Sequence, residues 1–233
     1  MGLMPKISSI ATADRLWEAA RGRLPVLFHQ EQRAGIVLLR QLARGEAVSI
    51  AQFAMALGVS FDAAEALLKN SALSPLVHID EAGRVRGFFG LSVVRTIHHL
   101  TVDGQQLWTW CAVDTLFIPE LLGARAEVES RDPETGQTVR LAVTAAGIES
   151  ADPRSVVVSM NSPQTWEVTS ATRLMESCCH FILFFGSRAA GERWQTKHPE
   201  TVLLTPDEAF TFGKRQNAHL FGTELARLRA DSP

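Results

Sequence analysis

Tyrosine is absent from the 233 residues, and cysteine occurs only three times, as Cys111, Cys178 and Cys179. The absence of tyrosine removes one common proton donor from any active site. An odd number of cysteines, in a chain that begins with no recognisable export signal, predicts reduced thiols and no disulfide framework. Cys178 and Cys179 are poor disulfide partners for each other, because a bridge between adjacent cysteines strains the backbone.

Neither sign of charge dominates the chain, whose formal net charge is −2 and whose isoelectric point is about 6.4. This balance argues against a strongly basic nucleic-acid binder. The longest uncharged run, residues 47–61, is shorter than the roughly 20 residues of a membrane-spanning helix. Residues 1–15 contain no long apolar segment, so we expect no secretory signal, no membrane association and a cytoplasmic location.

The first 90 residues predict a helical domain that ends in a hairpin. Residues 26–43 have a helical apolar pattern, and Ser49 and Ser60 are typical N-caps for two further helices. Two short β-rich runs follow, around a turn at residues 80–83. We interpret residues 1–90 as a winged-helix-like domain, preceded by an extended N-terminus to which we assign no role.

DNA binding is one function of such a domain, but a fold does not establish a function. The helix in the place of a recognition helix, residues 61–70, carries Asp62, Glu65 and only one cation, Lys69. It would therefore present a net negative charge to phosphates, and we expect no nucleic-acid partner.

Residues 91–233 predict an α+β core of antiparallel hairpins flanked by helices. Alternating runs surround a turn at Asp103-Gly104 and another at residues 132–136, and residues 155–160 and 177–185 are two more β-rich runs. Pro206 begins a C-terminal helix. Dinucleotide, P-loop and HExxH motifs are absent.

Cys111 and Asp114 form the first candidate site. Cys111 ends an aromatic strand and precedes a helix that we expect to kink or restart near Pro119 and to stop at Gly123. A helix N-terminus lowers the pKa of a nearby thiol, and Asp114, one turn further, can face the same pocket. CxxD alone is a weak motif, because buried cysteines near acidic residues are common.

Cys178 and Cys179 belong to the second candidate site. If residues 178–185 form a strand, Cys178 and His180 share one face, whereas Cys179 falls on the wholly apolar opposite face. This alternation favours Cys178 as the functional thiol. It predicts Cys179 to be a core residue whose replacement by serine mainly affects stability.

The segment WCAVDTLFIPELLG, followed about 65 residues later by SCCHFILFF, resembles the alkylmercury lyase family. The similarity extends from Gly87 to Leu220 and implies a winged-helix-like domain joined to an α+β core. It also implies that Cys111, Cys178 and Asp114 are the catalytic residues and that they hold the product Hg²⁺. A further cysteine of some family members falls on Asp132 here, and we expect no loss of activity from that difference.

The chemistry implied by the resemblance is protonolysis of a carbon–mercury bond to give a hydrocarbon and Hg²⁺. Mercury prefers thiolates, and an aspartate that carries the proton must have a raised pKa or receive its proton directly from a thiol. No cofactor is needed. The expected partners are an organomercurial substrate, small thiols and mercuric reductase. The aromatic residues Trp108, Trp110, Phe117 and Phe184 suit a hydrophobic organic group, and each is equally compatible with an ordinary core position.

An alternative is a winged-helix transcriptional regulator that senses soft metals through Cys111, Cys178 and His180. That alternative explains the N-terminal domain and the thiols. It leaves the aspartate next to Cys111 unexplained.

Overall fold

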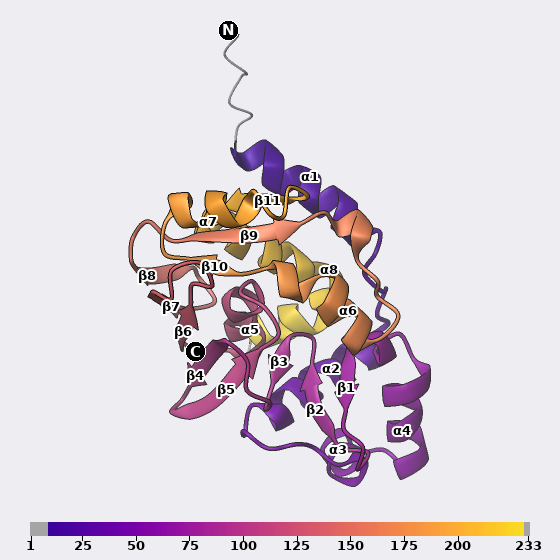
Figure 1. Cartoon of the computed structure of the whole chain (residues 1–233). Coiled ribbons are helices and arrows are strands. Elements are labelled where there is room, and N and C mark those ends of the chain that lie inside the picture. Colours follow the sequence, from indigo (N-terminus) through magenta and orange to yellow (C-terminus); the bar gives the residue numbers. More distant parts are fainter. Residues whose placement is uncertain (1–8, 231–233) are drawn as a thin grey trace, which may run out of the picture.

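The computed structural model describes residues 9–230, which form helices and two antiparallel sheets (Figure 1). Part of the extended N-terminus noted above lies outside the described residues. The α-helices are α1 (Ser9–Arg21), α2 (His29–Leu42), α3 (Ile50–Leu57), α4 (Phe61–Asn70), α5 (Asp114–Leu122), α6 (Ala171–Ser177), α7 (Arg188–Gln195) and α8 (Pro206–Ala230). The strands are β1 (Val77–Ile79), β2 (Val85–Phe88), β3 (Leu91–Ser92), β4 (His98–Val102), β5 (Gln105–Thr109), β6 (Ala126–Arg131), β7 (Thr138–Val143), β8 (Ile148–Asp152), β9 (Val157–Asn161), β10 (Phe184–Phe185) and β11 (Thr201–Leu204). The predicted α+β class is confirmed.

Both serine caps predicted in the N-terminal region are present. The Ser49 side chain accepts a hydrogen bond from the backbone of Gln52 and begins α3, which ends at Gly58 in the left-handed conformation. Ser60 caps α4 in the same way. The β1–β2 hairpin follows, so the helices and hairpin expected of a winged-helix-like unit are confirmed.

The larger sheet has the strand order β1-β2-β3-β5-β4-β6-β7-β8, and the smaller sheet has the order β10-β9-β11. Asp103 and Gly104, with φ of 49° and 78°, form the two-residue turn between β4 and β5. In Figure 1 the smaller sheet and α7 occupy the upper part of the molecule, and β1, β2, α3 and α4 occupy the lower part. Helix α5 lies between them, in contact with α8 and α2.

The N-terminal hairpin continues into the larger sheet, because Phe88 of β2 pairs with Leu91 of β3. One hydrophobic core cluster contains buried residues from Ala20 to Leu225. The division into domains at residues 1–90 and 91–233 stays a prediction. The described residues share both a sheet and a core across that boundary.

The strand expected over residues 177–185 is wrong. Helix α6 extends to Ser177, residues 179–181 form a 3₁₀ turn, and only Phe184 and Phe185 are extended in a sheet. The apolar run is suited to either structure, because a short buried helix end and a short buried strand have similar composition. The face assignment of Cys178 and Cys179 therefore does not apply.

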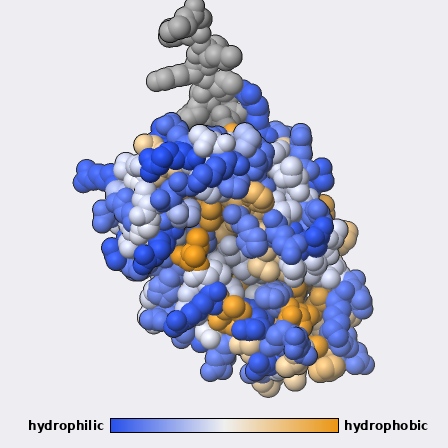
Figure 2. All heavy atoms as spheres, viewed as in Figure 1, coloured by the Kyte–Doolittle hydropathy of each residue, from blue (hydrophilic) through white to orange (hydrophobic). Residues whose placement is uncertain are grey.

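Within the described residues, no single helix has the length and apolar composition of a membrane span. Helices α3 and α4 satisfy that test only when taken together, and the chain bends by 108° between them. Figure 2 shows a mainly hydrophilic face on which apolar residues emerge in small separate groups.

Candidate active site

The segment before α5 folds back on itself through hydrogen bonds around Cys111. The Cys111 backbone N–H donates to Oδ2 of Asp114 at 2.8 Å, and the Thr109 hydroxyl donates to the Cys111 carbonyl at 2.8 Å. Asp114 is the first residue of α5, so its carboxylate also lies at the positive end of the helix. The predicted proximity of Cys111 and Asp114 is confirmed. Helix α5 ends at Gly123 as predicted, but it continues through Pro119, so the restart expected there is wrong.

Gly90 gives the Asp114 carboxylate the space it occupies. Gly90 has a φ of +91°, and a Cβ atom at this position would lie 2.4 Å from Cγ of Asp114. The adjacent Phe89 also has a positive φ, 47°. Only glycine permits this close approach of carboxylate and backbone.

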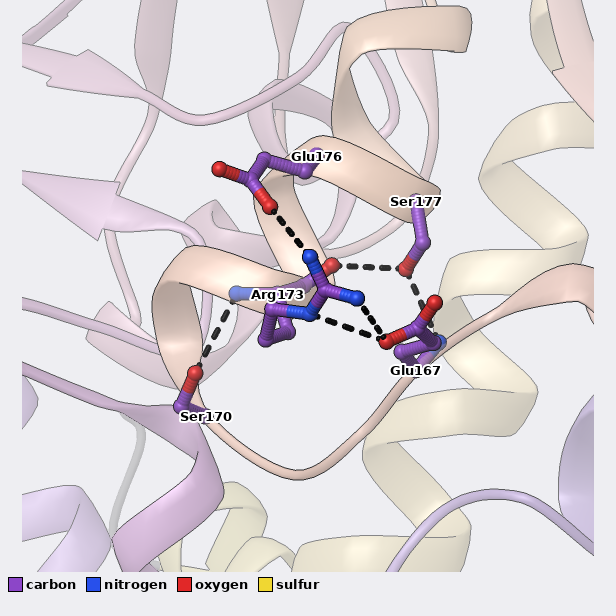
Figure 3. Close-up of polar contacts among 5 residues, drawn as sticks. All are labelled: Glu167, Ser170, Arg173, Glu176 and Ser177. Carbon is purple, nitrogen blue, oxygen red and sulfur yellow. Dashed lines mark hydrogen bonds and ion pairs between the residues drawn. The ribbon is translucent and has the colours of Figure 1, made fainter.

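The two other cysteines follow α6, whose C-terminal end is held by a polar network (Figure 3). The Ser177 hydroxyl donates to the Arg173 carbonyl at 2.7 Å and accepts the Glu167 N–H at 2.8 Å. The Arg173 guanidinium forms ion pairs with Glu167 and Glu176. The helix therefore ends at a defined place, directly before Cys178.

A buried amide attaches this helix end to the smaller sheet. Asn161, on β9, donates through Nδ2 to the Ser177 carbonyl at 2.7 Å, and its Oδ1 accepts the indole N–H of Trp166 at 3.0 Å. Both groups of the amide are thus satisfied inside the protein. Asn161 links the cysteine-bearing turn to the aromatic residue that forms part of the cavity wall.

A backbone hydrogen bond joins the two candidate segments, since the Ala112 N–H donates to the Ile182 carbonyl at 3.0 Å. The Sγ atoms of Cys111 and Cys179 and a carboxylate oxygen of Asp114 all lie within 4.8 Å of one another. The Cys178 thiol lies outside this group of three, although Cys178 also lines the cavity described below. All four residues are buried, with exposed fractions of 7% or less.

Burial dominates the electrostatics of the four groups. It raises the pKa of Asp114 to about 7, although hydrogen bonds from Cys111 act in the opposite direction. Burial also raises the pKa of the thiols of Cys111 and Cys178. The raised pKa expected of a proton-carrying aspartate is confirmed, whereas the lowered pKa expected for the Cys111 thiol is wrong, because desolvation outweighs the helix terminus.

A small cavity of about 40 Å³ adjoins these groups, and most of its lining side chains are apolar. Its lining comprises Leu24, Leu76, Phe89, Gly90, Trp110, Cys111, Val113, Asp114, Trp166, Leu174, Cys178, Cys179, Ile182, Phe212 and Gln216. Of the four aromatic residues expected at the organic group, only Trp110 is among them. Trp108 instead contacts His99 and Arg95, while Phe117 and Phe184 are buried beside Phe89 and His98.

Several residues of the cavity were not found by sequence reasoning. Leu24, Trp166, Phe212 and Gln216 come from segments far apart along the chain, and no local pattern distinguishes them from ordinary core residues. Gly90 could have been found from the sequence, because a glycine that ends the short FFG segment between two β-rich runs indicates a positive φ angle or a close backbone approach.

Asp132, at the position of the additional family cysteine, is buried, and its carboxylate accepts three hydrogen bonds. Oδ1 accepts the N–H groups of Glu134 and Thr135 at 2.8 and 3.1 Å, and Oδ2 accepts the N–H of Gly186 at 2.9 Å. The turn between β6 and β7 is thereby joined to the segment that follows the cysteine pair. Asp132 thus stabilises the contact between these two segments and does not line the cavity.

His180, a ligand in the regulator alternative, is exposed and absent from the cavity lining. Glu65 on α4 forms an ion pair with Lys69, the single cation of that helix. Neither observation favours a soft-metal regulator that binds DNA.

A carboxylate with a pKa near 7 beside buried thiols defines a class of site that binds a soft metal and carries a proton. Comparison with known proteins specifies that class. The family model for MerB, alkylmercury lyase, matches residues 91–217. The alkylmercury lyase of Bacillus cereus is 38% identical to this chain over 82% of this chain and 82% of its own length. The alkylmercury lyase of Pseudomonas putida is 35% identical over 76% of this chain and 80% of its own length.

The fold is also shared with a solved structure, the mercury-bound form of MerB2. The TM-score is 0.69 at 21% identity, over 89% of this chain and 98% of that chain. The chain belongs to the alkylmercury lyase family.

Proposed function

We propose that this protein cleaves the carbon–mercury bond of organomercurials by protonolysis, releasing a hydrocarbon and Hg²⁺. The observation that carries the proposal is the carboxyl of Asp114, with its pKa near 7, beside buried thiols in an apolar cavity. Membership of the alkylmercury lyase family supports it. The apolar walls suit the organic group of the substrate.

The proposed reaction uses Cys111, Cys178 and Asp114. Cys111 displaces the small thiol that carries R–Hg⁺, and the Cys111 proton leaves with that thiol. Asp114 then takes the proton from the Cys178 thiol, and the resulting thiolate forms a second sulfur–mercury bond. Two thiolates increase the electron density on the bound carbon. Asp114 then delivers its proton to that carbon, the carbon–mercury bond breaks, R–H leaves, and Hg²⁺ remains on two sulfurs.

The raised pKa of Asp114 removes most of the cost of that proton transfer. An aspartate with an ordinary pKa near 3.9 would cost roughly 4 kcal/mol to protonate at pH 7. A carboxyl whose pKa is about 7 is close to half-protonated at that pH, so it can both accept and donate. The thiols are protonated at rest, and the bond to mercury supplies the energy of their deprotonation.

The reaction as proposed requires no cofactor. Two small thiols remove Hg²⁺ from the protein, and mercuric reductase receives it. We place the protein in the cytoplasm, where a reducing environment keeps free cysteines reduced.

The experiment that tests the proposal is incubation of the purified protein with methylmercury and excess thiol, followed by assay of methane in the headspace and Hg²⁺ in solution. We expect catalytic methane release from the wild type. Asp114→Asn should reduce it at least 100-fold while the protein still binds Hg²⁺, because the amide keeps the shape of the carboxyl but carries no transferable proton.

Asp62→Asn, at an exposed position on α4, is the matched control and should keep wild-type turnover. If the wild type binds mercury tightly and releases no methane, the protein is a thiol metal-binding protein and the proposal is wrong. If Asp114→Asn turns over normally, the assignment of the proton carrier is wrong.

A further inference from the structure

We propose that Cys179 is a mercury ligand, and that it can replace Cys178 as the partner of Cys111 in holding the product Hg²⁺. The proposal rests on the proposed lyase function. It extends that function by assigning a role to a third thiol. Its basis is the position of the Cys179 side chain in the cavity.

Cys179 is the cysteine of the adjacent pair whose sulfur lies beside both Cys111 and Asp114. Its Sγ belongs to the group of ligand atoms within 4.8 Å of one another, and the Cys178 Sγ does not. The reason is local: α6 ends with Cys178 at φ −126° and ψ −68°, and Cys179 begins a 3₁₀ turn. This turn, and the Ala112–Ile182 hydrogen bond, bring Cys179 against the segment of Cys111.

The spacing of these two sulfurs suits a bridging soft metal ion. A two-coordinate ion separates its two sulfurs by about twice one metal–sulfur bond, or roughly 4.6 Å if the bond is as short as the ~2.3 Å of a zinc thiolate. The Cys111 and Cys179 sulfurs lie within 4.8 Å of each other, so they need not be drawn together over a long distance to share one ion. An ion can therefore bind between them with little movement of the backbone, and Asp114 offers an oxygen as a weak third ligand.

Cys178 and Cys179 are adjacent in the chain and both line the cavity, which supplies the route of exchange. When Hg²⁺ is held by Cys111 and Cys178, the Cys179 sulfur forms a bond to mercury and the bond from mercury to Cys178 breaks. The Cys179 proton passes to the Cys178 sulfur. One sulfur–mercury bond is formed and one is lost, the charge is unchanged, and no other reactant is needed.

The test measures the binding of Hg²⁺ alone, with no organomercurial present, to the wild type, Cys178→Ser, Cys179→Ser and the double variant Cys178→Ser/Cys179→Ser. X-ray absorption gives the number of sulfur neighbours of mercury, and competition with a chelating dithiol gives the affinity. We expect Cys178→Ser to keep two sulfur neighbours and to bind at least 100-fold more tightly than the double variant.

The proposal is overturned if Cys178→Ser and the double variant bind Hg²⁺ equally weakly, with one protein sulfur each. Far-UV circular dichroism verifies that each variant is folded, and Cys178→Ala/Cys179→Ser replaces a double variant that is not. The methane assay on the wild type is a separate readout. Its failure would contradict the lyase function and leave the assignment of the mercury ligands to be decided by these binding data.

Discussion

At the scale of single residues, the environment of Asp114 determines what the site can do. Its carboxylate accepts the Cys111 N–H, lies against the backbone of Gly90 and is removed from solvent. Desolvation is the largest influence on it and raises its pKa to about 7. The same burial that makes it a proton carrier therefore reduces the stability of the fold when the carboxyl is ionised.

Asp114→Asn is accordingly expected to increase the free energy of unfolding at high pH. The pKa of Asp114 is about 7 in the folded protein and 3.8 in the unfolded chain. The wild type therefore has its full free energy of unfolding below about pH 4, where the carboxyl is protonated, and loses part of it as the pH rises through 7. The neutral amide has no such loss. The difference between variant and wild type should grow from near zero at pH 4 to as much as about 4 kcal/mol at pH 8.

Urea denaturation of both proteins across this pH range measures the difference, and the exposed Asp62→Asn serves as the control. A difference that does not change between pH 4 and pH 8 would mean that the Asp114 carboxyl is not desolvated in solution.

Gly90→Ala should displace the Asp114 carboxylate and reduce methane release by a factor of 10 or more. The new Cβ atom would meet Cγ of Asp114 at 2.4 Å, and alanine is strained at a φ of +91°. Gly83→Ala separates the two effects, because Gly83 has a φ of +77° and a Cβ atom there meets nothing within 4 Å. Equal losses of activity in the two variants would show that backbone strain alone is responsible.

At the scale of secondary structure elements, the site depends on how the ends of elements are held. The cysteine pair follows the end of α6, which is held by the Arg173 network (Figure 3). A hydrogen bond from Asn161 to the Ser177 carbonyl also holds it. The Asp132 carboxylate joins the turn between β6 and β7 to Gly186, after the same cysteine pair. These contacts position a loop that has little regular structure of its own.

Asp132→Ala should reduce the free energy of unfolding by roughly 2–3 kcal/mol, because three backbone N–H groups lose a charged acceptor and that of Gly186 is buried. Asp80→Ala is the matched control, since Asp80 also accepts backbone N–H groups within a hairpin, but its partners Arg84 and Ala82 belong to that same hairpin. Thermal and urea denaturation compare the two. A loss in Asp132→Ala no larger than that in Asp80→Ala would contradict the bridging role.

At the scale of the whole molecule, the cavity exists only because distant segments meet. Leu24 follows α1, Trp166 lies between the small sheet and α6, and Gln216 belongs to α8. The same core cluster extends through the N-terminal helices and the α+β region, and the larger sheet crosses residue 90. The two parts predicted from the sequence are therefore joined in one hydrophobic interior.

We expect a single cooperative unfolding transition in urea as a result. Residues 26–90 contain no tryptophan, so tryptophan fluorescence reports mainly on the remainder, whereas circular dichroism at 222 nm also includes α2, α3 and α4. The two probes should give the same midpoint. Separate midpoints would indicate that the N-terminal helices unfold as an independent domain.

Much of the fold could be predicted locally. Ser49, Ser60, Gly58 and Gly123 end or begin helices as expected, and the Asp103-Gly104 turn forms its hairpin. These features depend on capping side chains and on residues that adopt positive φ angles. Both can be recognised from the residue types within a few positions of the sequence. The prediction of a strand over residues 177–185 was wrong because apolar composition alone does not distinguish a strand from a buried helix end.

The candidate site divides in the same way. The residue types, their spacing and their aromatic context were sufficient to predict candidate thiols and a candidate carboxylate and to indicate the family, because those are properties of the linear chain. Which thiol lies beside Cys111, which aromatic residues line the cavity and how far the pKa of Asp114 rises were decided only by the folded chain. Distances between sulfurs and the loss of water around a carboxyl depend on segments more than 60 residues apart, and no local pattern encodes them.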